Sequence, residues 1–269
     1  MNPANQLWVQ RTDTGDFAPE AMARHIDLQQ AHLLGRWHSP ASACSTALEW
    51  ALWSMAQEPA QDGCFPWGAH QARQLGLTGE HWGQLHLCHW QVSNGQVSLM
   101  QPDWPAADAL AQLWLELAEF VTDAGLQLMS PQGGQACVHG EILRDLPTAA
   151  LDKVMGRPIG SYLPDSPALR RLQSEVQMWF YNHPLLQGGA RPINSIWISG
   201  TGALTPALAG VLDRLRWHTA DATPKSGDDW LCASDVQASA WRLGAAPWTQ
   251  RLWRRFRPVA LWEPHHELD

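Results

Sequence analysis

Apolar residues recur at intervals of three and four in several stretches of the chain, which is the spacing of an amphipathic helix. Near the start, this pattern predicts two helices, from about Pro19 to Leu34 and from about Ala41 to Gln57, with Gly35 ending the first. A third helix is predicted from Pro105 to Ala124, with Gly125 as its left-handed cap. Its apolar stripe consists of Leu110, Leu113, Trp114, Leu117 and Val121.

Alternating residues predict two hairpins on either side of the third helix. The first runs from Gln84 to Met100 around Asn94-Gly95, a pair that tolerates the positive φ angles of a tight turn. The second has short strands at about Leu126–Met129 and Ala136–Val138. Period-two alternation, together with the helical stripe, predicts one shared core for seven residues: Cys88, Trp90, Val97, Leu99, Leu113, Trp114 and Leu117.

The second half begins with a stretch rich in proline and glycine, Leu146 to Pro164, where we place a domain boundary. Ser166-Pro167 then predicts the start of a helix that continues to about Asn182. A β-branched strand follows at Ile193–Ile198. Further elements are predicted as helices at about Pro206–Arg216 and Pro247–Phe256 and a last strand at Val259–Trp262.

This order of elements predicts an α+β fold rather than a parallel, doubly wound sheet. Residues 1–145 form an antiparallel half built as hairpin, helix and hairpin. Residues 146–269 form a mixed α/β half that contains a glycine-rich strand–turn–helix. The sequence leaves open whether the two halves share one sheet.

Composition narrows the classes of function. The 269 residues include 45% hydrophobic side chains and carry a formal charge of −8, which disfavours binding to nucleic acid or to an anionic membrane surface. The start of the chain has no basic and apolar leader pattern, and no run of 18 apolar residues occurs, so the cytoplasm is the expected compartment. Seventeen tryptophans are scattered among aliphatic neighbours, which indicates packing rather than a stacking platform.

Cysteine and histidine spacing gives little support for a metal. The five cysteines are odd in number and lack a Cys-x-x-Cys pair, so we interpret them as reduced thiols and expect no metal and no cofactor. A zinc alternative uses His81, His86, Cys88 and His89, but His89 points to the opposite strand face from His86 and Cys88.

The strongest candidate site is the glycine-rich turn Ser199, Gly200, Thr201 and Gly202, between a strand and a helix. Such a turn exposes backbone N–H groups and hydroxyls that can hold a phosphate or carboxylate. The alternative is that the glycines serve only to turn the chain, because neither the dinucleotide-binding spacing nor a P-loop lysine is present. Arg157 and Arg191, in flanking loops, are the cations expected nearby, and Asn194 and Glu175 complete the candidate ligand-binding set.

Several segments carry a family resemblance: Cys88–Val92, Leu146–Thr148, Gly156-Arg157, Leu172–Met178, His183-Pro184 and Pro192–Gly202. Over about residues 84–262 the chain resembles a proteobacterial family described as cofactor-independent phosphoglycerate mutase-like or as regulatory proteins of the Rpf type. Archaeal-type mutases look similar only over the His-Pro, Asn-strand and Gly-x-Gly segments. Their catalytic core needs two metal ions around a Ser or Thr nucleophile, and none of its Asp and His metal ligands has a counterpart here.

Two functions follow as hypotheses. The first is a binding or regulatory protein that recognises a small anionic, phosphorylated metabolite or a partner protein. The alternative is an isomerase or phosphotransferase acting on a phosphorylated small acid such as phosphoglycerate. The missing metal ligands favour the first hypothesis.

Overall fold

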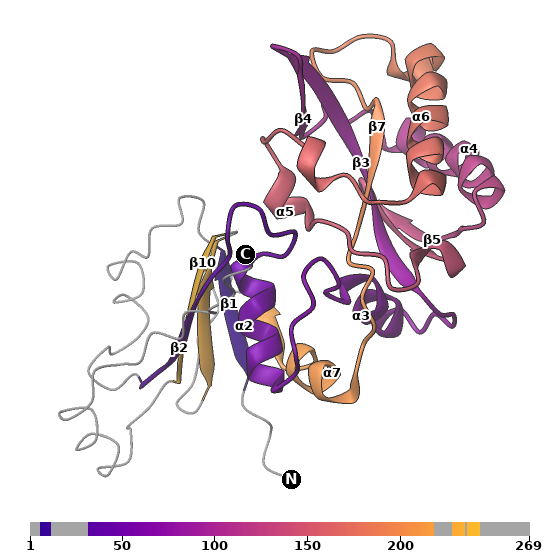
Figure 1. The fold of residues 1–269 in the computed structure, drawn as a ribbon. Coiled ribbons are helices and arrows are strands. Elements are labelled where there is room, and N and C mark those ends of the chain that lie inside the picture. The colour runs from indigo at the N-terminus through magenta and orange to yellow at the C-terminus, as the bar shows by residue number, and fades with distance from the viewer. Residues whose placement is uncertain (1–5, 12–31, 218–227, 235, 243–269) are drawn as a thin grey trace. The chain divides into compact units, whose positions relative to one another are not determined.

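A computed structural model describes residues 6–11, 32–217, 228–234 and 236–242 (Figure 1). The chain divides into two compact units that are interleaved in sequence. The first unit comprises Met1–Ala41, Thr46–Ala60 and Thr205–Asp269, and the second comprises Ser42–Ser45 and Gln61–Leu204. The second unit combines helices with antiparallel strands, and the two sheets together confirm the α+β prediction.

The first unit contains a five-stranded mixed sheet in the order β2-β10-β9-β1-β8. Its strands are β1 (Leu7–Arg11), β2 (His32–His38), β8 (Leu215–Trp217), β9 (Asp229–Ala233) and β10 (Gln237–Arg242). Strand β1 runs parallel to β8 and β9, whereas β10 is antiparallel to β9 and β2. Strands from the two ends of the chain therefore build one sheet.

Two helices belong to the same unit, α2 (Ala47–Ala56) and α7 (Pro206–Leu212). Helix α2 confirms the second predicted helix, although it begins later because Thr46 caps it. The Thr46 hydroxyl accepts a hydrogen bond from the backbone N–H of Glu49, and the Glu49 carboxylate accepts one from the N–H of Thr46. Both ends of this capping box are buried.

Two predicted helices of the first unit need correction. The end of the helix predicted at 19–34 lies in β2, and Gly35 is inside that strand, where Leu33 to His38 alternate between half-buried and exposed. Pairing with β10 overrides the local helical pattern. The helix predicted to reach Arg216 ends at Leu212 and is followed by β8. The helix at 247–256, the strand at 259–262 and residues 12–31 lie outside the described residues.

The second unit contains an antiparallel sheet in the order β4-β3-β6-β5, with β7 paired to β3. Its strands are β3 (Trp82–Ser93), β4 (Gln96–Met100), β5 (Gln127–Gln132), β6 (Gln135–His139) and β7 (Ser195–Ser199). Both predicted hairpins are confirmed. In the first, Asn94 and Gly95 have φ angles of 50° and 75°, as the turn requires.

Helices α4 (Ala107–Asp123) and α6 (Pro167–Asn182) cover one face of this sheet (Figure 1). Both confirm the predicted helices, with Gly125 at a φ of 79° after α4 and the Ser166 hydroxyl capping α6 through Leu169. The shorter elements are α3 (Trp67–Gln74), α5 (Leu151–Val154) and single 3₁₀ turns at Glu141–Leu143, Gly160–Tyr162 and Pro184–Leu186.

The core of the second unit is split by the sheet, which corrects the prediction of a single core. Leu85 and Leu87 of β3 pack with Leu113, Trp114 and Leu117 of α4. The alternate residues of the hairpin face the other cluster, which contains Cys88, Leu99 and Trp197 with Trp90 and Val97 packed against it. Because both faces of β3 are buried, its two alternating sets belong to two separate clusters.

Residues 146–164, where the sequence suggests a boundary, lie within the second unit. Their backbone is tied to three earlier segments, because Thr148 donates to Gly63, Ala150 to Cys44 and Gly156 to Leu99. Strand β7, from the second half of the chain, pairs with β3 from the first half.

Among the described residues, no helix combines the length and the apolar character needed to cross a bilayer.

Candidate functional site

The glycine-rich turn follows β7 directly and packs against the start of α3. Gly200 has a φ of +72°, and its carbonyl accepts a hydrogen bond from the N–H of Gly68 at 2.9 Å. A Cβ on Gly200 would lie 3.0 Å from the Trp67 side chain, and a Cβ on Gly202 would overlap the carbonyl of Cys64. Both glycines are therefore required by backbone packing.

Ser199, the first hydroxyl of the turn, faces the protein interior. Its Oγ lies 3.0 Å from Nε2 of His86 on the neighbouring strand β3, and the two residues are 3% and 7% exposed. Burial lowers the pKa of His86 to about 4, so the imidazole is neutral at physiological pH. This hydroxyl is engaged inside the fold.

Thr201, the second hydroxyl, also makes its contacts inside the fold. It donates to the carbonyl of Leu146 and accepts from the Thr148 hydroxyl at 3.0 Å, and both threonines are buried. The bond to Leu146 ties the turn to the segment that begins with Asp145. The two hydroxyls that the sequence offered as donors to a ligand therefore make their hydrogen bonds within the fold.

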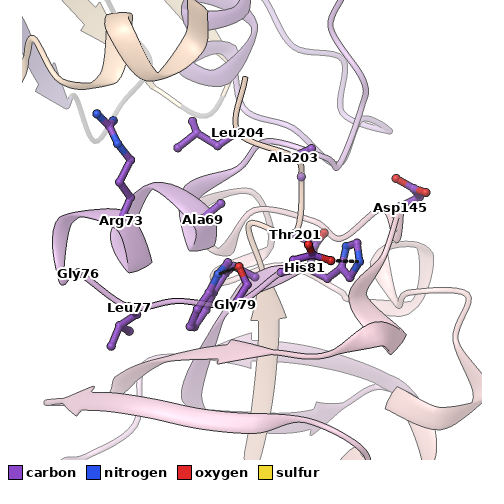
Figure 2. A pocket seen from close by; sticks show the side chains of 13 residues that line it. Ala69, Arg73, Gly76, Leu77, Gly79, His81, Asp145, Thr201, Ala203 and Leu204 are labelled. Carbon is purple, nitrogen blue, oxygen red and sulfur yellow. Dashed lines mark hydrogen bonds and ion pairs between the residues drawn. The ribbon is translucent and has the colours of Figure 1, made fainter. Parts of the chain in front are cut away.

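The backbone N–H groups of the turn are in a different situation. Within the described part of the chain, none of the N–H groups from Thr201 to Leu204 donates a hydrogen bond. The same four residues line a cavity of about 500 Å³ in the second unit (Figure 2). Its other lining residues are Ala69, Arg73, Gly76, Leu77, Gly79, Glu80, His81, Trp82 and Asp145. The cavity thus combines backbone donors that have no acceptor in the described chain with charged side chains.

Figure 2 shows Arg73 and Asp145 on opposite sides of the segment from Thr201 to Leu204. His81 has a backbone φ of 54° and Asp145 a φ of 49°, both in the left-handed region that non-glycine residues rarely adopt. Strained positions of this kind gather at functional sites more often than elsewhere.

The Asp145 side of the cavity carries more negative than positive charge. Nε2 of His81 lies 3.9 Å from a carboxylate oxygen of Glu80 and 3.6 Å from one of Glu141. The only guanidinium among these groups is Arg144, whose Nε lies 2.7 Å from Glu141. The hydrogen bond and charge of Glu141, with smaller contributions from Asp145 and Glu80, raise the pKa of Arg144. Three carboxylates therefore surround one guanidinium.

The other candidate residues lie at the far end of β3 and β7. Asn194 precedes β7, and its side chain accepts from the N–H of Trp90 at 2.6 Å and donates to the carbonyl of Trp90 at 3.0 Å. The carbonyl of Arg157 accepts from the N–H of Leu99, which is paired with Trp90. Ser199, next to the turn, pairs with Gln84, which lies six residues before Trp90 in β3. About 20 Å of strand therefore separates the residues around Trp90 from the turn.

Arg191 and Glu175 are also occupied elsewhere. Arg191 contacts Asp103 through its guanidinium at 3.5 Å and through its backbone N–H at 2.9 Å. Glu175 forms an exposed ion pair with Arg171, one turn earlier in α6, at 2.8 Å. Neither residue lines the cavity beside the turn.

Arg73, Glu80 and Asp145 are cavity residues that sequence reasoning missed, and His81 was considered only as a zinc ligand. The cluster of Gly76, Gly79 and Gly83 around them signals tight turns but no specific chemistry.

His86 and His89 of the zinc alternative have separate partners. Nε2 of His86 lies next to Oγ of Ser199, and Nδ1 of His89 lies 2.8 Å from the carbonyl of Pro192. In the ranges that the structure describes, no three His, Cys, Asp or Glu residues are grouped to hold a metal.

Comparison with solved structures gives four matching chains. No family model matches the chain and no curated protein matches it, so the expected resemblance to Rpf-type regulatory proteins has no support there. A solved cofactor-independent phosphoglycerate mutase from Thermoplasma acidophilum DSM 1728 is similar at a TM-score of 0.34 and 12% identity, over 90% of this chain and 91% of that one. A TM-score this low does not establish a common fold, and no residue role is transferred from that enzyme.

Proposed function

We propose that the protein binds a small anionic metabolite in the cavity beside Thr201–Leu204 and acts as a binding or regulatory protein. One observation carries the proposal: four consecutive residues whose N–H groups have no acceptor within the described chain line a cavity of about 500 Å³. Backbone N–H groups without a protein acceptor are free to donate to a ligand, and an anion is a ligand that such groups hold well. Small-molecule pockets typically have volumes of about 300–1,000 Å³.

The two hydroxyls of the turn favour a binding role over catalysis, because both are held by contacts within the fold. Ser199 would be the natural nucleophile of the turn, but its Oγ is buried against His86 and Ser199 does not line the cavity. The Thr201 hydroxyl is held by Leu146 and Thr148. The turn therefore offers N–H donors to a ligand rather than a reactive oxygen.

The test uses Ala203, because this residue lines the cavity and is exposed. Gly200 and Gly202 are unsuitable, since a side chain at either would disturb the packing of the turn. Ala203→Asp places a negative charge beside the N–H groups, and Ala203→Asn is its neutral control of the same shape. Calorimetric titration with phosphate, sulfate and 3-phosphoglycerate is expected to show about tenfold weaker binding for Ala203→Asp and little change for Ala203→Asn.

Two results would contradict the proposal. One is the absence of binding of all three anions by the wild-type protein at millimolar concentration. The other is equal affinity in the Asp and Asn variants, both folded by circular dichroism. Incubation of the protein with 3-phosphoglycerate and Mg²⁺ or Mn²⁺ covers the enzymatic alternative, because formation of the 2-phospho isomer would place the protein among the isomerases.

A further inference from the structure

The charged groups around the cavity are distributed unevenly. Thr201 to Leu204 present N–H donors, and Asp145 lies next to them through the hydrogen bond from Thr201 to Leu146. Glu80 and His81 line the same cavity, and Glu141 and Arg144 adjoin them. Glu80 and Asp145 each place a negative charge on this part of the lining, whereas Arg73 lines the other side, so the carboxylates would repel a ligand that was anionic throughout.

We propose that the ligand is amphoteric: a small molecule that carries an anionic group for the N–H donors of Thr201–Leu204 and an ammonium group for the carboxylates of Glu80 and Asp145. This inference rests on the proposed function, since it specifies the ligand of the same cavity. It assigns Glu80 and Asp145 a role in selecting the ligand, a role that a purely anionic ligand would leave unexplained.

The chemistry of each group supports this assignment. Backbone N–H groups donate and cannot accept, so they select the acceptor end of a ligand. Ionised carboxylates only accept, so they select the donor end, and an ammonium group offers three donors together with the opposite charge. Both carboxylates are exposed, as Glu80 has a side chain that is 87% accessible, so the selectivity they provide is moderate and sensitive to salt.

The test compares O-phospho-D-serine with 3-phospho-D-glycerate, because the two share the phosphate, the carboxylate and the configuration at C2 and differ in an ammonium in place of a hydroxyl. Calorimetry at low salt is expected to show about fourfold tighter binding of phosphoserine by the wild-type protein. This preference should shrink in 0.5 M NaCl, because exposed charges are then screened.

The variant Glu80→Gln/Asp145→Asn removes the two charges while keeping side-chain shape. Asparagine tolerates the positive φ at position 145, so the backbone is preserved. The ratio of the two affinities should fall to about one in this variant. The matched control, Asp165→Asn/Glu175→Gln, removes two carboxylates outside the cavity and should keep the wild-type ratio.

The outcomes separate this inference from the function on which it rests. Equal binding of the two compounds by the wild-type protein, with affinity still lost in Ala203→Asp, overturns the amphoteric ligand and leaves the anion site standing. An equal loss of preference in the control and cavity variants also overturns it, since the effect would then come from net charge. Binding of neither compound overturns both.

Discussion

His86 and Ser199 join strands β3 and β7 through a hydrogen-bonded pair of buried side chains, with Nε2 and Oγ 3.0 Å apart. A serine next to a histidine invites a catalytic interpretation. Here the pair lies inside the fold, outside the cavity lining, and the imidazole is kept neutral by its burial. Its measurable consequence is a dependence of stability on pH.

We expect the free energy of unfolding to fall as the pH is lowered from 6.5 toward 4. Burial lowers the pKa of His86 to about 4, whereas an unfolded histidine has a pKa of about 6.5. Between these values the unfolded state binds more protons, so acid favours unfolding, by about 2 kcal/mol at pH 5 relative to pH 7 from this group. Urea unfolding at both pH values measures the difference. In His86→Gln, which retains a partner for Ser199, the difference should shrink by this amount, and an unchanged difference would contradict the assignment.

Gly202→Ala should destabilise the second unit by about 3 kcal/mol or more, because the added Cβ would overlap the carbonyl of Cys64. Gly160→Ala is the matched control, since no atom lies within 4 Å of the position of its Cβ. Thermal unfolding followed by circular dichroism compares the two. If they melt at the same temperature, the close approach between the turn and Cys64 does not exist in solution.

Asn194→Ala should cost about 2 kcal/mol of stability and leave phosphate affinity unchanged. The Asn194 side chain pairs with both backbone groups of Trp90, and its loss leaves a partly buried donor and acceptor unmatched. Asn182→Ala is a suitable comparison, because Asn182 makes one exposed hydrogen bond to Met178 and should cost far less. Denaturant unfolding and phosphate titration of both variants separate a structural role from ligand binding, and a weaker phosphate affinity in Asn194→Ala alone would show that Asn194 contacts the ligand.

Arg191→Gln should not change the affinity for phosphate or for 3-phosphoglycerate. Its guanidinium contacts Asp103, and Arg191 precedes β7 whereas the turn follows that strand. Calorimetric titration of the variant beside wild type checks this. A loss of several-fold in affinity would mean that this cation reaches the bound anion, as the sequence alone suggested.

Local sequence signals were sufficient to predict much of the secondary structure of the second unit. Asn94-Gly95 fixes its hairpin through backbone conformation, and Ser166-Pro167 starts α6 through a cap. Both effects act within a few residues, so they can be predicted from a short window. The apolar stripe of α4 was predicted for the same reason, since Leu113, Trp114 and Leu117 are all buried.

The rest of the fold depends on contacts between residues distant in sequence, which local signals do not predict. Alternation in β3 separates Leu87 from Cys88 but does not say which of the two faces α4, because both sides of the strand are covered. His32–His38 became a strand only through pairing with β10, about 200 residues later. The cavity likewise joins His81, Asp145 and Thr201, whose proximity depends on long-range packing rather than on any motif.

The interleaved course of the chain determines the order in which its parts can fold during synthesis. Strands β1 and β2 are made early, but every described pairing partner they have, β8, β9 and β10, is made about 200 residues later. At a synthesis rate of about 5–20 residues per second, these strands remain without their pairing partners for roughly 10–40 s. Gln61–Leu204 emerges in that interval with its own sheet complete, so the second unit can fold first and the sheet of the first unit closes last.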